Sequence, residues 1–237
     1  MEKINFIFFG TPHVASDTLE ILFSHGIVPS VIVTSPDRPS GRGMKMTSSP
    51  VKLWADANNI PVLQPEKLDE EFSSNLSRFA CPLAIVVAYG KIIPESIISS
   101  FPKGILNIHY SLLPKYRGAS PVESALLNND QETGITIQKM VYELDAGDIV
   151  SMERVSVMPN DNTTTLRARL IKVGAEILAQ TLPEYVAGRI NPVPQDHTHK
   201  TKCGKMKKED GDITEETSDQ IKWNKFRAYF EWPRTYF

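Results

Sequence analysis

Two polar side chains stand two residues apart at the end of an apolar run, Asn107 and His109 in the segment 104–109. In a β-strand, residues i and i+2 point to the same face. If this run is a parallel strand, its carboxyl end opens into the crevice where α/β sheets bind ligands. The spacing therefore predicts an amide and an imidazole side by side at a candidate site. Taken alone, His109 is also consistent with a half-buried histidine whose ring binds the backbone.

A carboxylate beside the imidazole would favour a catalytic site over that alternative. Asp145 is the candidate, in the turn Leu144-Asp145-Ala146-Gly147-Asp148. An imidazole exchanges protons near neutral pH, and a nearby carboxylate orients it and favours its charged form. Turns also favour aspartate for local hydrogen bonds, so an ordinary turn residue is the alternative for Asp145 and our interpretation of Asp148.

The elements around these residues predict an α/β fold. Continuous apolar runs at 4–9, 31–34 and 83–88 lack the alternation of half-buried strands and are typical of parallel strands buried on both faces. The helix-like stretches that separate them are, in chain order, 14–24, 51–58 and 72–79. Strand alternating with helix favours right-handed βαβ units. We therefore predict a Rossmann-like open, mostly parallel sheet with helices on both faces.

The second half of the chain carries further element signals. Ser120 followed by Pro121 and Glu123 predicts a helix start with a capping box, because serine caps the helix and the glutamate reaches back to it. The alternating segments 134–140 and 149–157 predict two strands that flank the aspartate turn.

The longest helical pattern covers 162–187, and Pro183 within it is expected to kink the helix or end it early. From Gly188 the composition changes to proline and asparagine, then to lysine, then to acidic residues. We therefore predict one main domain over 1–188 and a C-terminal linker or extension over 189–237, without a complete second domain.

The composition and the lengths of the apolar runs exclude several classes of protein. The 237 residues are 41% hydrophobic with a net charge of −2, which excludes a disordered chain. No apolar run reaches the ~18 residues of a membrane span, and no secretory signal is recognisable. Cys81 and Cys203 are isolated and without metal-ligand spacing, so a cytoplasmic protein is expected. Basic residues concentrate locally, with four from Arg38 to Lys52 and five lysines from Lys200 to Lys208.

One string of motifs carries a family resemblance. Residues 107–118 read N-I-H-Y-S-L-L-P-K-Y-R-G, and 144–148 read L-D-A-G-D. Together they resemble the signature of folate-dependent formyltransferases. Further segments make the chain similar to the methionyl-tRNA formyltransferases among them, over residues 4–237. They are F-G-T-P at 9–12, S-P-D-R-P-S-G-R-G at 35–43, S-P-V-K at 49–52, Q-P-E-K-L at 64–68 and V-A-Y-G-K-I-I-P at 87–94.

The resemblance implies a reaction and the residues that perform it. The co-substrate would be 10-formyltetrahydrofolate, the acceptor the amino group of methionyl-tRNA, and no metal is required. Asn107 would donate to the oxyanion, His109 would handle the proton and Asp145 would orient the imidazole or take the proton through water. The folate would bind at Val87, Ala88, Tyr89, Gly90, Ile92, Ser111, Leu112, Leu113 and Pro114. The tRNA would bind at Arg38, Arg42 and Lys45.

Two other functions remain open at this point. A sugar N-formyltransferase would use a nucleotide-linked amino sugar as acceptor, and a non-catalytic relative would only bind folate or tRNA. The family usually continues into a C-terminal OB-like barrel that helps to hold tRNA, and this chain stops at Phe237. The arginine-containing segment 35–49 favours tRNA, and intact Asn107, His109 and Asp145 favour catalysis.

Overall fold

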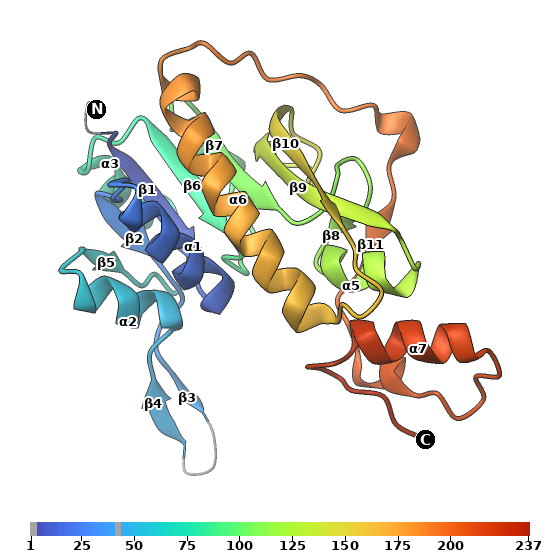
Figure 1. Ribbon diagram of the computed structural model, residues 1–237. Helices are drawn as coiled ribbons and strands as arrows, with labels where there is room; N and C mark the ends of the chain where they lie inside the picture. Colours follow the sequence, from blue (N-terminus) through green and yellow to red (C-terminus); the bar gives the residue numbers. More distant parts are fainter. Residues whose placement is uncertain (1–3, 41–43) are drawn as a thin grey trace.

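The computed structural model of the chain describes residues 4–40 and 44–237. A seven-stranded sheet forms its centre (Figure 1). In their order across the sheet the strands are β10 (Ile149–Ser156), β9 (Glu132–Lys139), β7 (Ile105–His109), β6 (Leu83–Val87), β1 (Phe6–Gly10), β2 (Val31–Val33) and β5 (Val62–Leu63). The strands from β7 to β5 are parallel, whereas β9 and β10 add an antiparallel edge.

The parallel strands are buried on both faces, which explains their continuous apolar runs. In β1, Phe6 and Phe8 pack on one face, while Ile7 and Phe9 pack on the other. All four side chains are essentially inaccessible to solvent. Burial of each contributes roughly 1.5–3 kcal/mol to stability. The predicted mostly parallel sheet, covered on both sides, is confirmed.

Helices divide between the two faces of the sheet. One face is covered by α1 (His13–Ser24), α2 (Pro50–Ala57), α5 (Pro121–Leu127) and α6 (Thr163–Val186). The other is covered by α3 (Glu70–Ser77) and α4 (Glu95–Ser99). In Figure 1, α6 lies beside α1 and runs along the sheet, where it also contacts β9 and β10.

The capping box predicted at Ser120 was wrong, and so was one of the two effects expected of Pro183, an early end of the helix. Although α5 starts at Pro121, the Ser120 side chain makes no capping bond. Glu123 instead pairs with Arg167 of α6 at 2.5 Å, and a charge-assisted bond of this kind is stronger than a bond to the backbone. Pro183 does not end α6 early, because the helix continues to Val186. So close to the carboxyl end, the missing amide of a proline removes only one of the last helical bonds.

The segment after α6 returns to the main sheet's edge. Its strand β11 (Lys202–Cys203) pairs in parallel with β8 (Arg117–Gly118), and its helix α7 (Asp219–Ala228) packs against α5. Two short 3₁₀ helices, His197–His199 and Lys208–Gly211, complete it. Figure 1 shows this orange-to-red segment leaving the end of α6 and reaching β8 and α5. The domain boundary near residue 188 stays a prediction.

A hairpin projects from the body of the protein (Figure 1). Its strands are β3 (Arg38–Ser40) and β4 (Lys45–Thr47), which pair in antiparallel fashion. The sequence indicated only a loop here, because strands of three residues are too short to show a hydrophobic pattern.

Candidate active site

Asn107 and His109 emerge together at the carboxyl end of β7. Their neighbours Leu106 and Ile108 pack in the core that α6 covers, whereas Ile105 packs in the core on the opposite face. Since side chains alternate along a strand, Asn107 and His109 share the face of Ile105. Strand β6 on one side and β9 on the other enclose them, through the pairs Val86–Asn107 and Thr136–His109.

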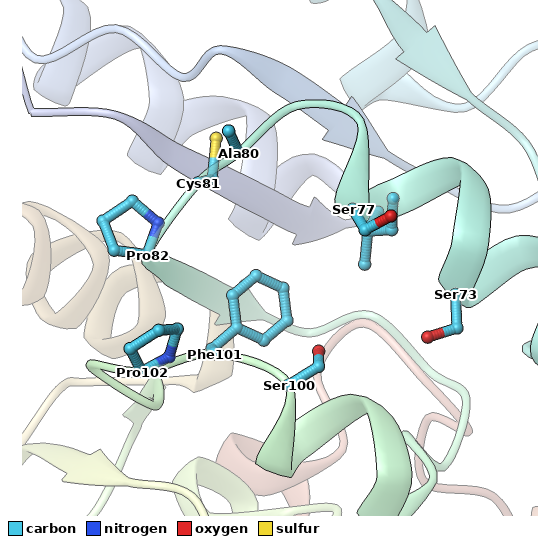
Figure 2. Close-up of a pocket in the computed structure, with 9 residues that line it drawn as sticks. Ser73, Ser77, Ala80, Cys81, Pro82, Ser100, Phe101 and Pro102 are labelled. Atoms are coloured by element: carbon cyan, nitrogen blue, oxygen red, sulfur yellow. The ribbon is translucent and has the colours of Figure 1, made fainter.

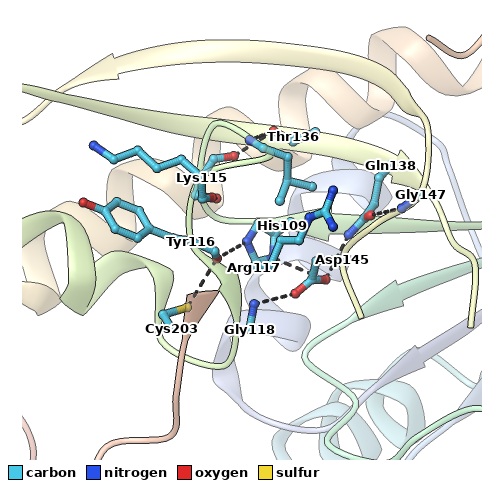
Figure 3. Close-up of polar contacts among 12 residues, drawn as sticks. His109, Lys115, Tyr116, Arg117, Gly118, Thr136, Gln138, Asp145, Gly147 and Cys203 are labelled. Carbon is cyan, nitrogen blue, oxygen red and sulfur yellow. Dashed lines mark hydrogen bonds and ion pairs between the residues drawn. The ribbon is translucent and has the colours of Figure 1, made fainter. Parts of the chain in front are cut away.

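The ring of His109 has a partner for each nitrogen (Figure 3). Nε2 lies 2.9 Å from the carbonyl oxygen of Tyr116, and Nδ1 lies 3.6 Å from Oδ1 of Asp145. Because a carbonyl only accepts, Nε2 carries the proton of the neutral ring, and Nδ1 is the nitrogen that can gain one. His109 thus has the backbone bond of a structural histidine and also the carboxylate of a catalytic one.

Burial has the largest effect on the pKa of this imidazole. Only 5% of His109 is exposed. Burial lowers the pKa of His109 below its usual range, while the carboxylate of Asp145 and the carbonyl of Tyr116 act against that effect. Burial therefore favours the neutral ring, in which Nδ1 can accept a proton.

The carboxylate of Asp145 is held by groups from other elements. Its Oδ2 accepts from the Gly118 amide at 2.7 Å, and its Oδ1 accepts from Nε2 of Gln138 at 2.9 Å. The backbone of Asp145 has a φ of 51°, in the left-handed region that non-glycine residues seldom adopt. These bonds reach β8 and β9, which distinguishes Asp145 from an aspartate that only caps its own turn.

The amide of Asn107 is a polar group of this site without a hydrogen-bond partner among the described residues. Its side chain is half-buried, and no hydrogen bond of that amide is found among residues 4–40 and 44–237. Its N–H groups are therefore available to a bound molecule. An amide in this position can donate to an oxygen that gains negative charge.

The first loop predicted to bind folate follows β6. Val87 and Tyr89 are buried, whereas Ala88, Gly90 and Ile92 are exposed. The φ angles of Ala88 and Gly90 are 46° and 83°, and Tyr89 is fixed by a bond from Thr11 Oγ1 to its carbonyl. Gly90 and Ile92 make no hydrogen bond within the described chain. Their open backbone groups, beside the apolar Ile92 side chain, fit a flat ring with amide-like edges.

The second such loop follows β7. Ser111 and Leu113 are buried, and Leu112 and Pro114 are half-buried. Thr136 of β9 donates to the carbonyl of Ser111 at 2.7 Å and accepts from the Leu113 amide at 3.1 Å. The loop is thereby anchored to the strand next to His109.

The residues predicted to bind tRNA belong to the projecting hairpin. Arg38 begins β3, Lys45 begins β4, and both are exposed. Arg42 lies outside the described residues. At the base of the hairpin, Asp37 accepts from Lys52 Nζ at 2.7 Å and from Gln64 Nε2 at 2.8 Å. These contacts tie the hairpin to α2 and to the end of β5.

A separate cavity of about 320 Å³ lies at the ends of the strands opposite to the candidate site (Figure 2). Among its lining residues, Cys81 and Pro82 precede β6, and Phe101 and Pro102 precede β7. It therefore lies at the amino ends of these strands, and no residue predicted for the site lines it.

Four residues in or beside this site were not predicted from the sequence. Gln138 shares the polar phase of its strand with Thr136, so the sequence pattern does not indicate that it is buried. Arg117 and Gln195 are buried and bond to each other, and nothing in the sequence around Gln195 indicates this. His197 is exposed, and its Nδ1 lies 2.9 Å from Nη2 of Arg117.

Cys81 and Cys203 are free thiols, as predicted. Within the described ranges, no three His, Cys, Asp or Glu side chains are grouped closely enough to hold a metal ion. No helix in those ranges has the length and apolar character needed to span a membrane.

Known proteins resemble the chain in sequence and in structure. Residues 2–182 match the family described as formyl transferase. A methionyl-tRNA formyltransferase of Koribacter versatilis is 43% identical over 229 residues, which cover 96% of this chain and 73% of that protein. One from Buchnera aphidicola is 39% identical over 238 residues, which cover 100% of this chain and 76% of that protein.

Solved structures of low sequence identity share the architecture. An N-formyltransferase from Helicobacter canadensis, in complex with folinic acid and dTDP-3-aminofucose, superposes with a TM-score of 0.72 at 18% identity. The match covers 95% of this chain and 80% of that one. At this identity the likeness shows the fold alone, and it confirms the fold class expected from the sequence.

Proposed function

The chain belongs to the formyl transferase family, and from that premise we propose that it transfers a formyl group from 10-formyltetrahydrofolate to the amino group of methionyl-tRNA. One observation carries the proposal. A buried imidazole lies beside a fixed carboxylate, at 3.6 Å, on the same strand end as an amide with no partner in the described chain. The relatives named methionyl-tRNA formyltransferase support the acceptor, since their similarity spans nearly the whole chain.

The amide of Asn107 would stabilise the charge that develops during transfer. The folate carries the formyl group, whose oxygen becomes negative as the amine attacks its carbon. An N–H of Asn107 aimed at that oxygen lowers the barrier, and loss of one such donor typically costs about 10²–10³ in rate.

His109 and Asp145 would manage the proton of the attacking amine. Nδ1 of the neutral ring accepts it, because Nε2 is already committed to Tyr116. The carboxylate of Asp145 would face the new imidazolium and stabilise it until the proton passes to N10 of the folate, which leaves as its bond to the formyl carbon breaks. Gly118 and Gln138 keep that carboxylate in place through the bonds described above.

The acceptor would approach along the β3–β4 hairpin, in the cytoplasm where charged tRNA is used. Arg38 and Lys45 extend from it into solvent, and Arg42 of the same segment would add a third cation. Exposed cations along a projecting hairpin can reach phosphates that a flat surface cannot.

A sugar N-formyltransferase remains the second candidate, and one assay separates it from the first. Purified protein is mixed with 10-formyltetrahydrofolate and either charged initiator tRNA or a panel of nucleotide-linked amino sugars. Formylation of the tRNA alone supports the proposal. Formylation of an amino sugar alone supports the second candidate, and ligand binding without turnover of any amine identifies a non-catalytic relative.

A further inference from the structure

The segment after α6 lies against the loop that holds the catalytic groups. Thr201 accepts from the Arg117 amide at 2.9 Å through its carbonyl and from the Tyr116 amide at 2.8 Å through Oγ1. Cys203 accepts from the Ala119 amide at 3.2 Å. The same loop offers the Tyr116 carbonyl to His109 and the Gly118 amide to Asp145. Residues beyond 182, where the family match ends, are thus in contact with the site.

Gln195 makes the most specific of these contacts. Its Nε2 donates to the carbonyl of Asp145 at 2.9 Å and to the carbonyl of Gly147 at 2.7 Å. Its Oε1 accepts from Nε and Nη2 of Arg117 at 3.2 and 2.7 Å. Since carbonyls only accept and a guanidinium only donates, these partners admit one orientation of the amide. The side chain is 4% exposed, so no solvent competes for it.

The turn that Gln195 holds needs support. Asp145 is in the left-handed region, which costs a non-glycine residue on the order of 1–3 kcal/mol unless its surroundings fix it. Gly147 is pressed against β9, where a Cβ would lie 1.9 Å from the Lys139 carbonyl oxygen. The two carbonyls that Gln195 binds belong to these same residues, so its amide clamps the turn on both sides of Ala146.

We propose that Gln195, oriented by Arg117, is a positioning residue for formyl transfer: it holds the turn that places the Asp145 carboxylate beside His109. The expected effect of Gln195 on the rate of formyl transfer rests on the proposed function. Its effect on the position of the aspartate turn does not. Arg117 is itself buried, and its remaining partners are His197 at 2.9 Å and Glu143, whose Oε1 lies 3.6 Å from Nη1.

Two variants separate positioning of the turn from anchoring of Arg117. Gln195→Glu keeps the acceptor for Arg117 but loses both donors, and its second oxygen faces two carbonyls. Gln195→Met loses every bond at nearly constant volume. If Gln195 served only to anchor Arg117, a glutamate at this position would anchor it at least as well. Because the donors hold the turn, both variants are expected to lower kcat about tenfold or more, with the KM for the folate changed less than about twofold.

A second readout needs no acceptor. The Gly118 amide bonds to the Asp145 carboxylate, so its hydrogen exchange reports where that carboxylate lies. In both variants this exchange is expected to quicken about tenfold or more, while the exposed-site control Gln131→Glu leaves it unchanged. If the wild-type chain formylates no tRNA, the proposed function is wrong. The hydrogen exchange of the Gly118 amide then still tests whether Gln195 positions the Asp145 carboxylate.

The outcomes are exclusive. Faster exchange at Gly118, with reduced kcat wherever the wild type is active, supports the proposal. Unchanged exchange, or a Gln195→Glu enzyme as active as the wild type, overturns it. Should Gln195→Met fail to fold, Gln195→Glu decides alone, because it retains the partner of Arg117.

Discussion

Nδ1 of His109 lies 3.6 Å from Oδ1 of Asp145, although the two residues come from different elements, the end of β7 and the turn between β9 and β10. Each is fixed by the same loop, His109 by the Tyr116 carbonyl and Asp145 by the Gly118 amide. The loop therefore sets the distance between imidazole and carboxylate. This explains why a short continuous motif and a distant aspartate act as one site.

Removal of the Asn107 amide should slow transfer without weakening folate binding. We expect Asn107→Ala to lower kcat by about 10²–10³, since the donor acts mainly on charge that develops in the transition state. Steady-state kinetics with charged tRNA measure this, and fluorescence titration with the folate checks binding. The variant Asn128→Ala, at the exposed end of α5, is the matched control. A normal kcat for Asn107→Ala would remove the residue from the mechanism.

The pKa of His109 should respond to Asp145 in a defined direction. Burial lowers that pKa and the Asp145 carboxylate raises it, so Asp145→Asn should lower it further. The base form of His109 is lost as pH falls through its pKa, and the acid limb of the transfer rate should therefore move to lower pH in the variant. NMR titration of the His109 ring measures the shift directly. A pKa that rises, or does not move, would contradict the interaction.

Gly118 should not tolerate a side chain. Its φ is 128°, and a Cβ there would lie 1.9 Å from the Cys203 carbonyl oxygen. We expect Gly118→Ala to reduce the free energy of unfolding by about 3 kcal/mol, because β8 and β11 must separate. Urea denaturation measures the loss. Gly204→Ala is the control, since nothing lies within 4 Å of its added Cβ. Equal stability of the two variants would show that the close approach is not rigid.

The hairpin should contribute salt-dependent affinity for tRNA. Loss of both Arg38 and Lys45 to alanine should raise the KM for charged tRNA and reduce the slope of log affinity against log salt by about 2. The KM for the folate should not change. Lys172→Ala with Lys222→Ala, two lysines on helices outside the hairpin, serves as the charge-matched control. If both double variants reduce the slope equally, the salt dependence would come from the net charge of the protein and not from the hairpin.

The sequence predicted best those features that depend on local pattern. Burial on both faces leaves continuous apolar runs such as 83–88, so the parallel strands were recognisable. The spacing of Asn107 and His109 follows from the period of a strand and needs no tertiary information. Their placement at the carboxyl end of β7 follows from the topology of a parallel sheet.

Features set by distant partners were not predictable in this way. The capping box at Ser120 was wrong because Glu123 bonds to Arg167, a residue on another helix. Gln195 lies in a polar segment after α6, and only the fold brings it to the aspartate turn. The β3–β4 hairpin has short exposed strands, and burial imposes no pattern on such residues.

The most direct test of the account is the single-turnover rate of formyl transfer to charged tRNA by Asp145→Asn. This variant keeps the size of the side chain and removes the charge beside His109. The account predicts a rate at least about 10² lower than that of the wild-type chain, with folate binding unchanged. A wild-type rate in this variant would contradict the proposed pairing of imidazole and carboxylate.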